Sequence, residues 1–136
     1  MLFVSLVCYS AIALLSLVFG VIYLTRSQFM PYHSLALSKS WSEVEPEVQT
    51  LILALMRVTG GGFLTASLAI FVLLVIPFQT QEAWAIYTVP AIALITSGSS
   101  FYATYLVRLK TPGNPPIKLS LLSIGLTIIG FVFSII

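Results

Sequence analysis

Few side chains in this sequence could do chemistry, and Arg57 stands out because it interrupts the apolar run of residues 51–78. A guanidinium inside such a run is costly unless it pairs, faces water or reaches the lipid headgroups. Arg57 follows Pro46 by about eleven residues, roughly 16 Å along a helix axis, which predicts a position near the edge of the hydrocarbon. Two interpretations stay open. Arg57 snorkels or pairs with the first loop, or it forms an anion or headgroup site with Tyr32 and His33.

Three consecutive glycines follow Arg57, and glycine is expensive inside a helix because it loses the most conformational freedom on folding. Close contact between helices would offset this cost, with a second small, polar surface supplied by the serines near residue 98. The alternative is a ligand-lined gap, opened by a kink at the glycines. The expected packing positions are Gly60, Gly61, Gly62, Ala66 and Gly98. The candidate ligand or partner contacts are Arg57, His33, Tyr32, Ser97, Ser100 and Tyr102.

The absence of several motifs argues against an enzyme. His33 is the only histidine, so paired axial ligands for haem and a metal site are not expected. No Asp or Glu lies inside an apolar run, which counts against a proton relay. The single Cys8 excludes a Cys-x-x-Cys redox motif, and no nucleophile, base and orienting group can be assembled. We therefore expect a protein without catalytic residues or cofactors.

The composition indicates a membrane protein. Hydrophobic residues make up 59% of the 136 residues and charged residues 7%, with a mean hydropathy of +1.08, whereas soluble domains carry about 25% charged residues. A spanning helix needs roughly 20 apolar residues. Four segments qualify, at about residues 2–24, 46–78, 84–108 and 118–136. The prediction is one all-α domain, a polytopic membrane protein with four transmembrane helices in an up-down bundle. We expect the first segment to be a membrane helix rather than a signal peptide.

The connections between these segments differ in length and character. Residues 79–83 are few enough to make a tight turn, so the second and third helices should be antiparallel neighbours. Residues 109–118 hold three prolines and a glycine, which predicts a stiff reversal. Residues 26–49 mix apolar and polar positions. They predict a short, partly helical segment at the membrane interface, with Trp41 as an anchor.

The basic residues predict the orientation of the bundle. The first and third connections share one side and carry Arg26, Lys39, Arg108, Lys110 and Lys118, while the opposite side carries only Glu82. The positive-inside rule places the basic side in the cytoplasm and both termini outside it. The net charge of +2 comes from too few basic residues for a nucleic-acid surface. The expected partners are the lipid bilayer and other membrane subunits or further copies of the chain.

Four stretches give the sequence a family resemblance. They are MPYH at 30–33, LALMRVTGGGF at 53–63, IPF at 76–78 and RLKTPGNPP at 108–116. With these stretches the chain resembles a group of small bacterial four-helix membrane proteins, similar in plan to the DoxX-like families. The resemblance implies a compact four-helix unit, located in a bacterial cytoplasmic membrane. It implies no catalytic residue.

Two functions are compatible with these observations. The first is a non-enzymatic accessory or interaction subunit of a membrane complex, because the chain has almost no soluble portion and few functional polar groups. The second is a small transporter, channel or lipid-binding protein with a pocket between the second and third helices. A cavity lined by Arg57, Ser97, Ser100 and Tyr102 would favour the second, and a seam closed by glycine and serine contacts would favour the first.

Overall fold

The computed structural model describes all 136 residues, and the chain is helical with no strand. Four long helices run through it, and a short helix and a 3-10 turn lie in the first connection. The fold predicted from the sequence is therefore confirmed. In chain order the elements are α1 (Leu2–Thr25), α2 (Pro31–Leu37), η1 (Trp41–Glu43), α3 (Pro46–Val75), α4 (Ala83–Lys110) and α5 (Ile117–Ile135).

Proline decides both ends of α3. Pro46 occupies the first turn, where its missing N–H removes no hydrogen bond, and Glu47 beside it faces the positive end of the helix dipole. The helix ends at Val75, before the predicted boundary near residue 78, because Pro77 disfavours helical backbone in the residue that precedes it. The Gln79 amide then donates to the carbonyl of Val75 at 2.9 Å, which satisfies a group left open at the helix end.

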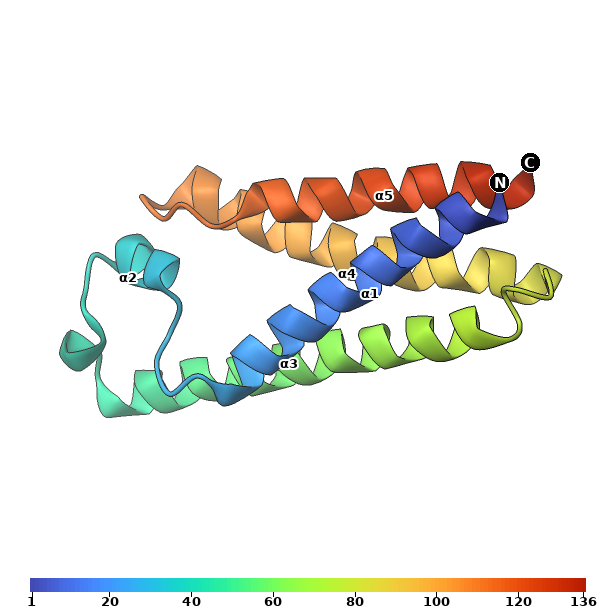
Figure 1. The fold of residues 1–136 in the computed structure, drawn as a ribbon. Coiled ribbons are helices and arrows are strands. Elements are labelled where there is room, and N and C mark those ends of the chain that lie inside the picture. Colours follow the sequence, from blue (N-terminus) through green and yellow to red (C-terminus); the bar gives the residue numbers. More distant parts are fainter.

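The four long helices form two pairs that diverge toward one end of the molecule. Figure 1 shows α1 crossing from α5, near the two termini, to α3 at the opposite end. The contacts agree: a Cβ on Gly130 of α5 would lie 3.0 Å from the Tyr9 ring, near the start of α1. At the other end of α1, a Cβ on Gly20 would lie 3.0 Å from the backbone nitrogen of Leu64 in α3. The pair α1–α3 thus separates from the pair α4–α5 with distance from the termini.

The closest helix contact differs from the one expected. We predicted a glycine–serine seam between α3 and α4, but the tight approach joins α3 to α1, where a Cβ on Gly60 would lie 2.9 Å from the Gly20 carbonyl oxygen. Ser67 supports the same contact by donating a buried hydrogen bond of 2.8 Å to the Ala13 carbonyl. Glycine on both helices lets the two backbones approach, which explains why this pair packs so closely.

The core fills only the end of the bundle that holds the termini. Its nine residues come from α1, α3, α4 and the turn at Phe78, whose ring meets Tyr9 edge-on at 5.4 Å between centroids. A separate small cluster of Phe29, Val44 and Met56 lies at the opposite end, under the first connection. Between these two clusters the diverging helix pairs leave the interior less well filled.

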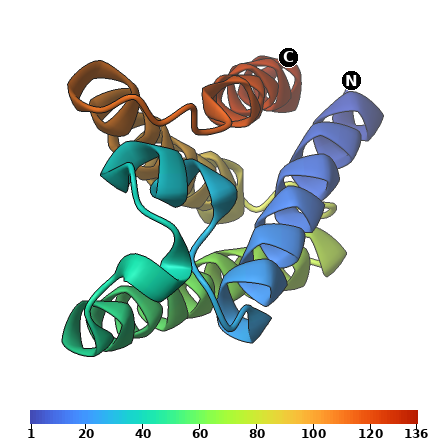
Figure 2. The ribbon, with the colours of Figure 1, turned by 90° about the vertical axis from the view of Figure 1, so that its left-hand side faces the viewer.

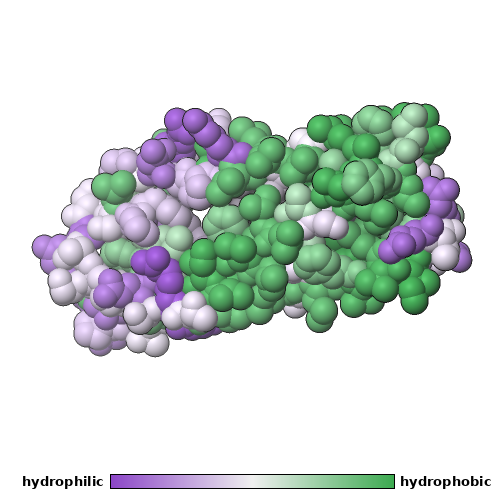
Figure 3. All heavy atoms as spheres, viewed as in Figure 1, coloured by the Kyte–Doolittle hydropathy of each residue, from purple (hydrophilic) through white to green (hydrophobic).

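The outer surface matches the composition. All four long helices are long and apolar enough to cross a membrane. Figure 3 shows a broad apolar band, with hydrophilic residues gathered at the end that carries α2 and a smaller hydrophilic group at the opposite end. Exposed leucine, isoleucine and valine side chains cover the band, as expected where lipid replaces water as the solvent. The chain is an integral membrane protein with several spans.

Candidate functional site

A cavity of about 550 Å³ lies where the two helix pairs diverge. Ligand pockets in proteins typically measure about 300–1,000 Å³, so this volume suits a small molecule or part of a lipid. Every helix contributes to its wall. On α4 the lining extends from Ile95 to Val107, about 18 Å at 1.5 Å per residue, which is little more than half of the roughly 30 Å hydrocarbon. The cavity therefore extends through about one leaflet.

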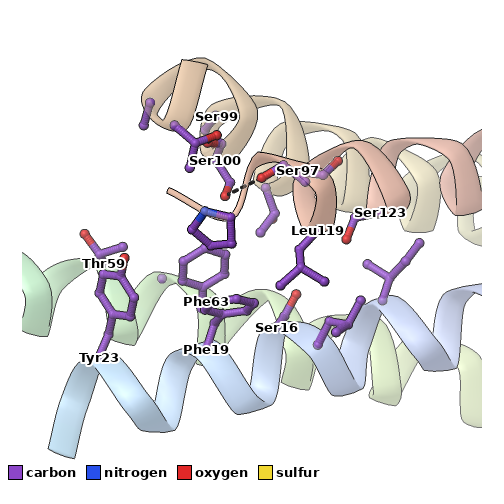
Figure 4. Close-up of a pocket in the computed structure, with 18 of the residues that line it drawn as sticks. Ser16, Phe19, Tyr23, Thr59, Phe63, Ser97, Ser99, Ser100, Leu119 and Ser123 are labelled. Carbon is purple, nitrogen blue, oxygen red and sulfur yellow. Dashed lines mark hydrogen bonds between the residues drawn. The ribbon is translucent and has the colours of Figure 1, made fainter. Parts of the chain in front are cut away.

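One wall of the cavity carries hydroxyl groups from α4 and α5. Figure 4 shows Ser97, Ser99 and Ser100 of α4 on the same side as Ser123 of α5. The Ser100 hydroxyl lies 3.2 Å from that of Ser120, so the two serines join α4 to α5 across the wall. Serine and threonine at spacings of three and four residues lie on one face of a helix, which brings these side chains together.

The facing wall is formed by α1 and α3 and is mainly apolar. Phe19 and Phe63 lie side by side there, with ring centroids 6.0 Å apart. Ile12 and Leu15 continue this wall along α1. The polar exceptions are Tyr23, Thr59 and Ser16. The Tyr23 hydroxyl bonds to Tyr32 and the Thr59 hydroxyl donates to the Leu55 carbonyl at 2.9 Å, whereas the Ser16 hydroxyl lies among apolar side chains and makes no hydrogen bond within the chain. The cavity thus has a polar side and an apolar side.

The short helix α2 closes the polar end of the cavity. Figure 2, viewed from that end, shows α2 between the α1–α3 pair and the α4–α5 pair. Tyr32 of α2 shares a hydrogen bond with the Tyr23 hydroxyl of α1. On its other side α2 meets the α4–α5 connection, where a Cβ on Gly113 would lie 3.0 Å from the Tyr32 carbonyl oxygen. Tyr32 therefore ties α2 to both helix pairs.

The sequence of α2 explains why His33 lines the cavity. Pro31 starts the helix, and His33, two residues later, accepts a hydrogen bond of 3.3 Å from the Met30 backbone nitrogen through Nδ1. This is the reciprocal half of a capping box, with histidine in the place of glutamate. The second ring nitrogen then carries the proton of the neutral imidazole and can donate to a ligand. The Tyr32 ring packs against His33 edge-on at 4.3 Å.

Burial sets the ionisation of the two aromatic groups on α2. Desolvation lowers the pKa of His33 from its ordinary value of 6.5, so the neutral form predominates at pH 7. Burial, and next the hydrogen bond with Tyr23, raise the pKa of the Tyr32 phenol well above its ordinary value. Both side chains are therefore uncharged where they line the cavity.

Arg57 lies outside the cavity wall. Its guanidinium donates to the carbonyl oxygen of Tyr23 at 2.9 Å and to that of Arg26 at 2.8 Å. These carbonyls belong to the end of α1, where backbone acceptors have no partner within the helix. Arg57 thus pairs with the end of α1 and the start of the first connection, and it makes no hydrogen bond to Tyr32 or His33, which line the cavity.

The other predicted site residues are divided between the cavity, the interior and the lipid-facing surface. Ser97 and Ser100 line the cavity together with Tyr32 and His33. Tyr102 points away and is 66% exposed. Of the expected packing residues, Gly60 contacts α1 and Ala66 is buried, whereas no heavy atom lies within 4 Å of a Cβ on Gly61, Gly62 or Gly98. Gly62 lines the cavity instead, because α3 and α4 separate at this depth.

The cavity opens to the bilayer between α3 and α4. Its lining residues Thr59 and Gly62 on α3 are exposed, and so are Ile95, Ser99 and Ala103 on α4. The two helices meet near the turn that joins them and are separate here (Figure 1). A molecule dissolved in the lipid can therefore enter sideways, without passing through the polar end.

Several lining residues escaped the sequence analysis. Ser16 on α1 and the pair Ser120 and Ser123 on α5 were not singled out, although both segments are otherwise strongly apolar. The spacing of the hydroxyl residues in the sequence could have indicated the α5 pair. Hydroxyl residues recur on α4 at 97, 100 and 104 and on α5 at 120, 123 and 127, which is one face of each helix. What the spacing does not show is that these two faces meet across a cavity.

Comparisons with known proteins add no relative: no family model, no curated protein and no solved structure matches the chain. The resemblance to small bacterial four-helix membrane proteins stays a prediction.

Proposed function

We propose that this protein binds an amphipathic molecule of the membrane in the cavity between its two helix pairs. The observation that carries the proposal is the cavity of about 550 Å³, lined by hydroxyls on one wall and by apolar side chains on the other. Binding sites for small molecules combine a mainly apolar lining with a few converging polar groups. The opening between α3 and α4 gives such a molecule direct access from the lipid.

The arrangement supports binding rather than catalysis. The lining offers hydroxyls and one neutral imidazole, but no carboxylate that could act as a base beside a nucleophile. Nor do any three His, Cys, Asp or Glu side chains gather to hold a metal ion. We therefore propose a carrier, sensor or transporter of the bound molecule. We also propose that the basic connections of the protein face the cytoplasm and that both termini lie outside it, which the positive-inside rule supports. The family resemblance supports a bacterial inner membrane.

A matched pair of glycine variants tests the cavity. Gly62 lines it and Gly61 does not, yet a Cβ on either residue meets no atom within 4 Å. Leucine at either position also favours the helix by about 0.5–1 kcal/mol over glycine. The substitution Gly62→Leu should obstruct the opening between α3 and α4, whereas Gly61→Leu should add a side chain outside it.

Lipids that remain bound after purification in mild detergent can be measured by native mass spectrometry. We expect wild type and Gly61→Leu to retain a small amphipathic molecule and Gly62→Leu to lose most of it. Thermal unfolding of each variant checks that all three proteins are folded. Equal retention by Gly62→Leu, at full folding, would exclude this cavity as the binding site.

An accessory role in a membrane complex is the second candidate. The specific observation is a face of α3 where Gly61 lies four residues before Thr65 and where a Cβ on Gly61 would meet no atom within 4 Å. Small residues at this spacing let a second helix approach closely. Cross-linking in native membranes tests it: Gly61→Leu should then abolish a cross-linked species that Gly62→Leu preserves. Persistence of the same species in Gly61→Leu would count against a partner on this face.

A further inference from the structure

The chemistry of the cavity wall indicates which amphipathic molecule would bind. From the wall we infer that the ligand is an uncharged lipid whose head carries a hydroxyl group, taken from the leaflet at the α2 end. This inference rests on the proposed function and goes further by naming the ligand class. Three features of the wall support it: its charge, its hydrogen-bonding capacity and its length.

No charged side chain faces the cavity. Its lining contains no Asp, Glu, Lys or Arg, and the guanidinium of nearby Arg57 is used by the carbonyls of Tyr23 and Arg26. The pKa of His33 is lowered by burial, so its imidazole supplies no positive charge at pH 7 either. A phosphate, carboxylate or ammonium group would lose its hydration here without gaining a counter-charge. Charged lipids are therefore disfavoured.

The hydroxyl wall consists largely of acceptors. On α4, Thr96 donates to the Ile92 carbonyl at 2.8 Å and Ser97 to the Ala93 carbonyl at 2.6 Å. Ser99 is bonded in the same way to Ile95, at 2.7 Å. Each of these hydroxyls has used its only hydrogen within its own helix and keeps lone pairs for a ligand. A ligand that donates a hydrogen bond therefore fits this wall better than one that only accepts.

The remaining polar groups suit a hydroxyl, which both donates and accepts. His33 offers an N–H at the α2 end, because its Nδ1 already accepts from Met30. The side-chain hydroxyls of Ser16 and Ser123 make no hydrogen bond within the chain, so each can donate or accept. An alcohol can therefore accept from the imidazole and donate to a serine. An ester or ether can only accept, and it leaves the serine lone pairs unused.

The shape of the cavity places the head and the chain of the lipid. Its length of about 18 Å corresponds to one leaflet rather than the whole bilayer. Tyr23, Tyr32 and His33 mark the end near the headgroups, whereas Ile12 and Leu15 line the deeper part. The hydroxyl head would thus lie beneath α2, and the hydrocarbon chain would extend along α1 toward the bundle core.

A set of single-chain lipids with identical tails tests the ligand class. The protein is placed in phosphatidylcholine nanodiscs with a photoactivatable diazirine analogue of oleyl alcohol, and the cross-linked residues are mapped by mass spectrometry. Unlabelled oleyl alcohol, methyl oleate and oleate then compete at equal mole fraction in the bilayer. The experiment is run at pH 9, where oleate is ionised.

We expect labelling on the cavity faces of α1 and α4, and competition by oleyl alcohol. Methyl oleate has no hydroxyl hydrogen to donate. It should compete about fivefold less well, which is the loss in affinity expected for one missing hydrogen bond. Oleate should compete less well by about tenfold or more, because its charge has no partner. Equal competition by methyl oleate would overturn the requirement for a donor, and stronger competition by oleate would overturn the requirement for an uncharged head.

The same experiment separates this inference from the proposed function. Labelling that is lost in Gly62→Leu and kept in Gly61→Leu shows that the cavity is the binding site, whichever competitor is best. Labelling that is equal in all three proteins, or that misses the cavity faces, would overturn both the ligand class and the cavity as a site.

Discussion

Replacement of Gly60 by alanine tests whether the close contact between α1 and α3 holds the bundle together. A Cβ at this position would lie 2.9 Å from the Gly20 carbonyl oxygen and 3.0 Å from the Leu24 backbone nitrogen. Both atoms belong to the backbone of α1, so neither can move without shifting the helix. The neighbouring Gly61 provides the control, since a Cβ there meets no atom within 4 Å. The two glycines are adjacent in one helix and differ only in what faces them.

Two opposing effects set the size of the change. Alanine in place of glycine inside a helix contributes about 0.8–1.0 kcal/mol of stability. Forcing an extra carbon into a well-packed contact typically costs about 1–3 kcal/mol. We therefore expect Gly61→Ala to stabilise the protein by up to about 1 kcal/mol and Gly60→Ala to leave it unchanged or to destabilise it by up to about 2 kcal/mol. The gap between the variants should be about 1–3 kcal/mol.

Unfolding of both variants in mixed micelles by sodium dodecyl sulfate, followed by circular dichroism, measures this difference. The ratio of folded to unfolded protein should favour Gly61→Ala by at least about fivefold, because about 1 kcal/mol corresponds to that factor. If Gly60→Ala were as stable as Gly61→Ala, α1 and α3 could not be packed backbone to backbone at this point. The two helix pairs would then not diverge from a tight α1–α3 contact.

Two further predictions concern the polar end. Arg57→Gln should lower the free energy of unfolding by about 1–3 kcal/mol, because it removes charge-assisted hydrogen bonds to the carbonyls of Tyr23 and Arg26. Hydrogen exchange in residues 23–28 should then be faster, and unchanged exchange would contradict this pairing. His33 has a pKa below 6.5, so the stability that its neutral form gives to α2 is complete above about pH 6.5 and declines as the pH falls through the lowered pKa. The protection factors of the amides in residues 32–37, which correct for the pH dependence of intrinsic exchange, should therefore fall on acidification in wild type, and less so in His33→Gln. Identical pH profiles of the protection factors would exclude His33 as the cause.

The sequence contained most of the information about the helices. Each apolar run is about as long as a membrane span or longer, and polar or proline-rich residues separate the runs. The number of helices and their approximate boundaries therefore follow from local composition. The one clear difference is the end of α3, which stops at Val75 because Pro77 acts on the residue before it. Pro77 is visible in the sequence and marks this boundary.

The candidate site was only partly predictable. Ser97, Ser100, Tyr32 and His33 were singled out and do line the cavity, but Arg57 and Tyr102 do not. An arginine in an apolar run predicts that its guanidinium is paired with a hydrogen-bond acceptor, because an unpaired charge is costly there. Whether this partner is a ligand or the end of another helix depends on where α1 stops in space, which the sequence of α3 does not contain.

The sequence by itself determined that the chain crosses a membrane four times, because the energy of placing backbone and side chains in lipid is a local property of each segment. Only the tertiary structure decided that the glycines of one triplet have different surroundings. Gly60 contacts α1, a Cβ on Gly61 would meet no atom within 4 Å, and Gly62 lines a cavity. The reason is geometric: neighbouring residues of a helix point about 100° apart, and their surroundings depend on the crossing of α1 from one helix pair to the other.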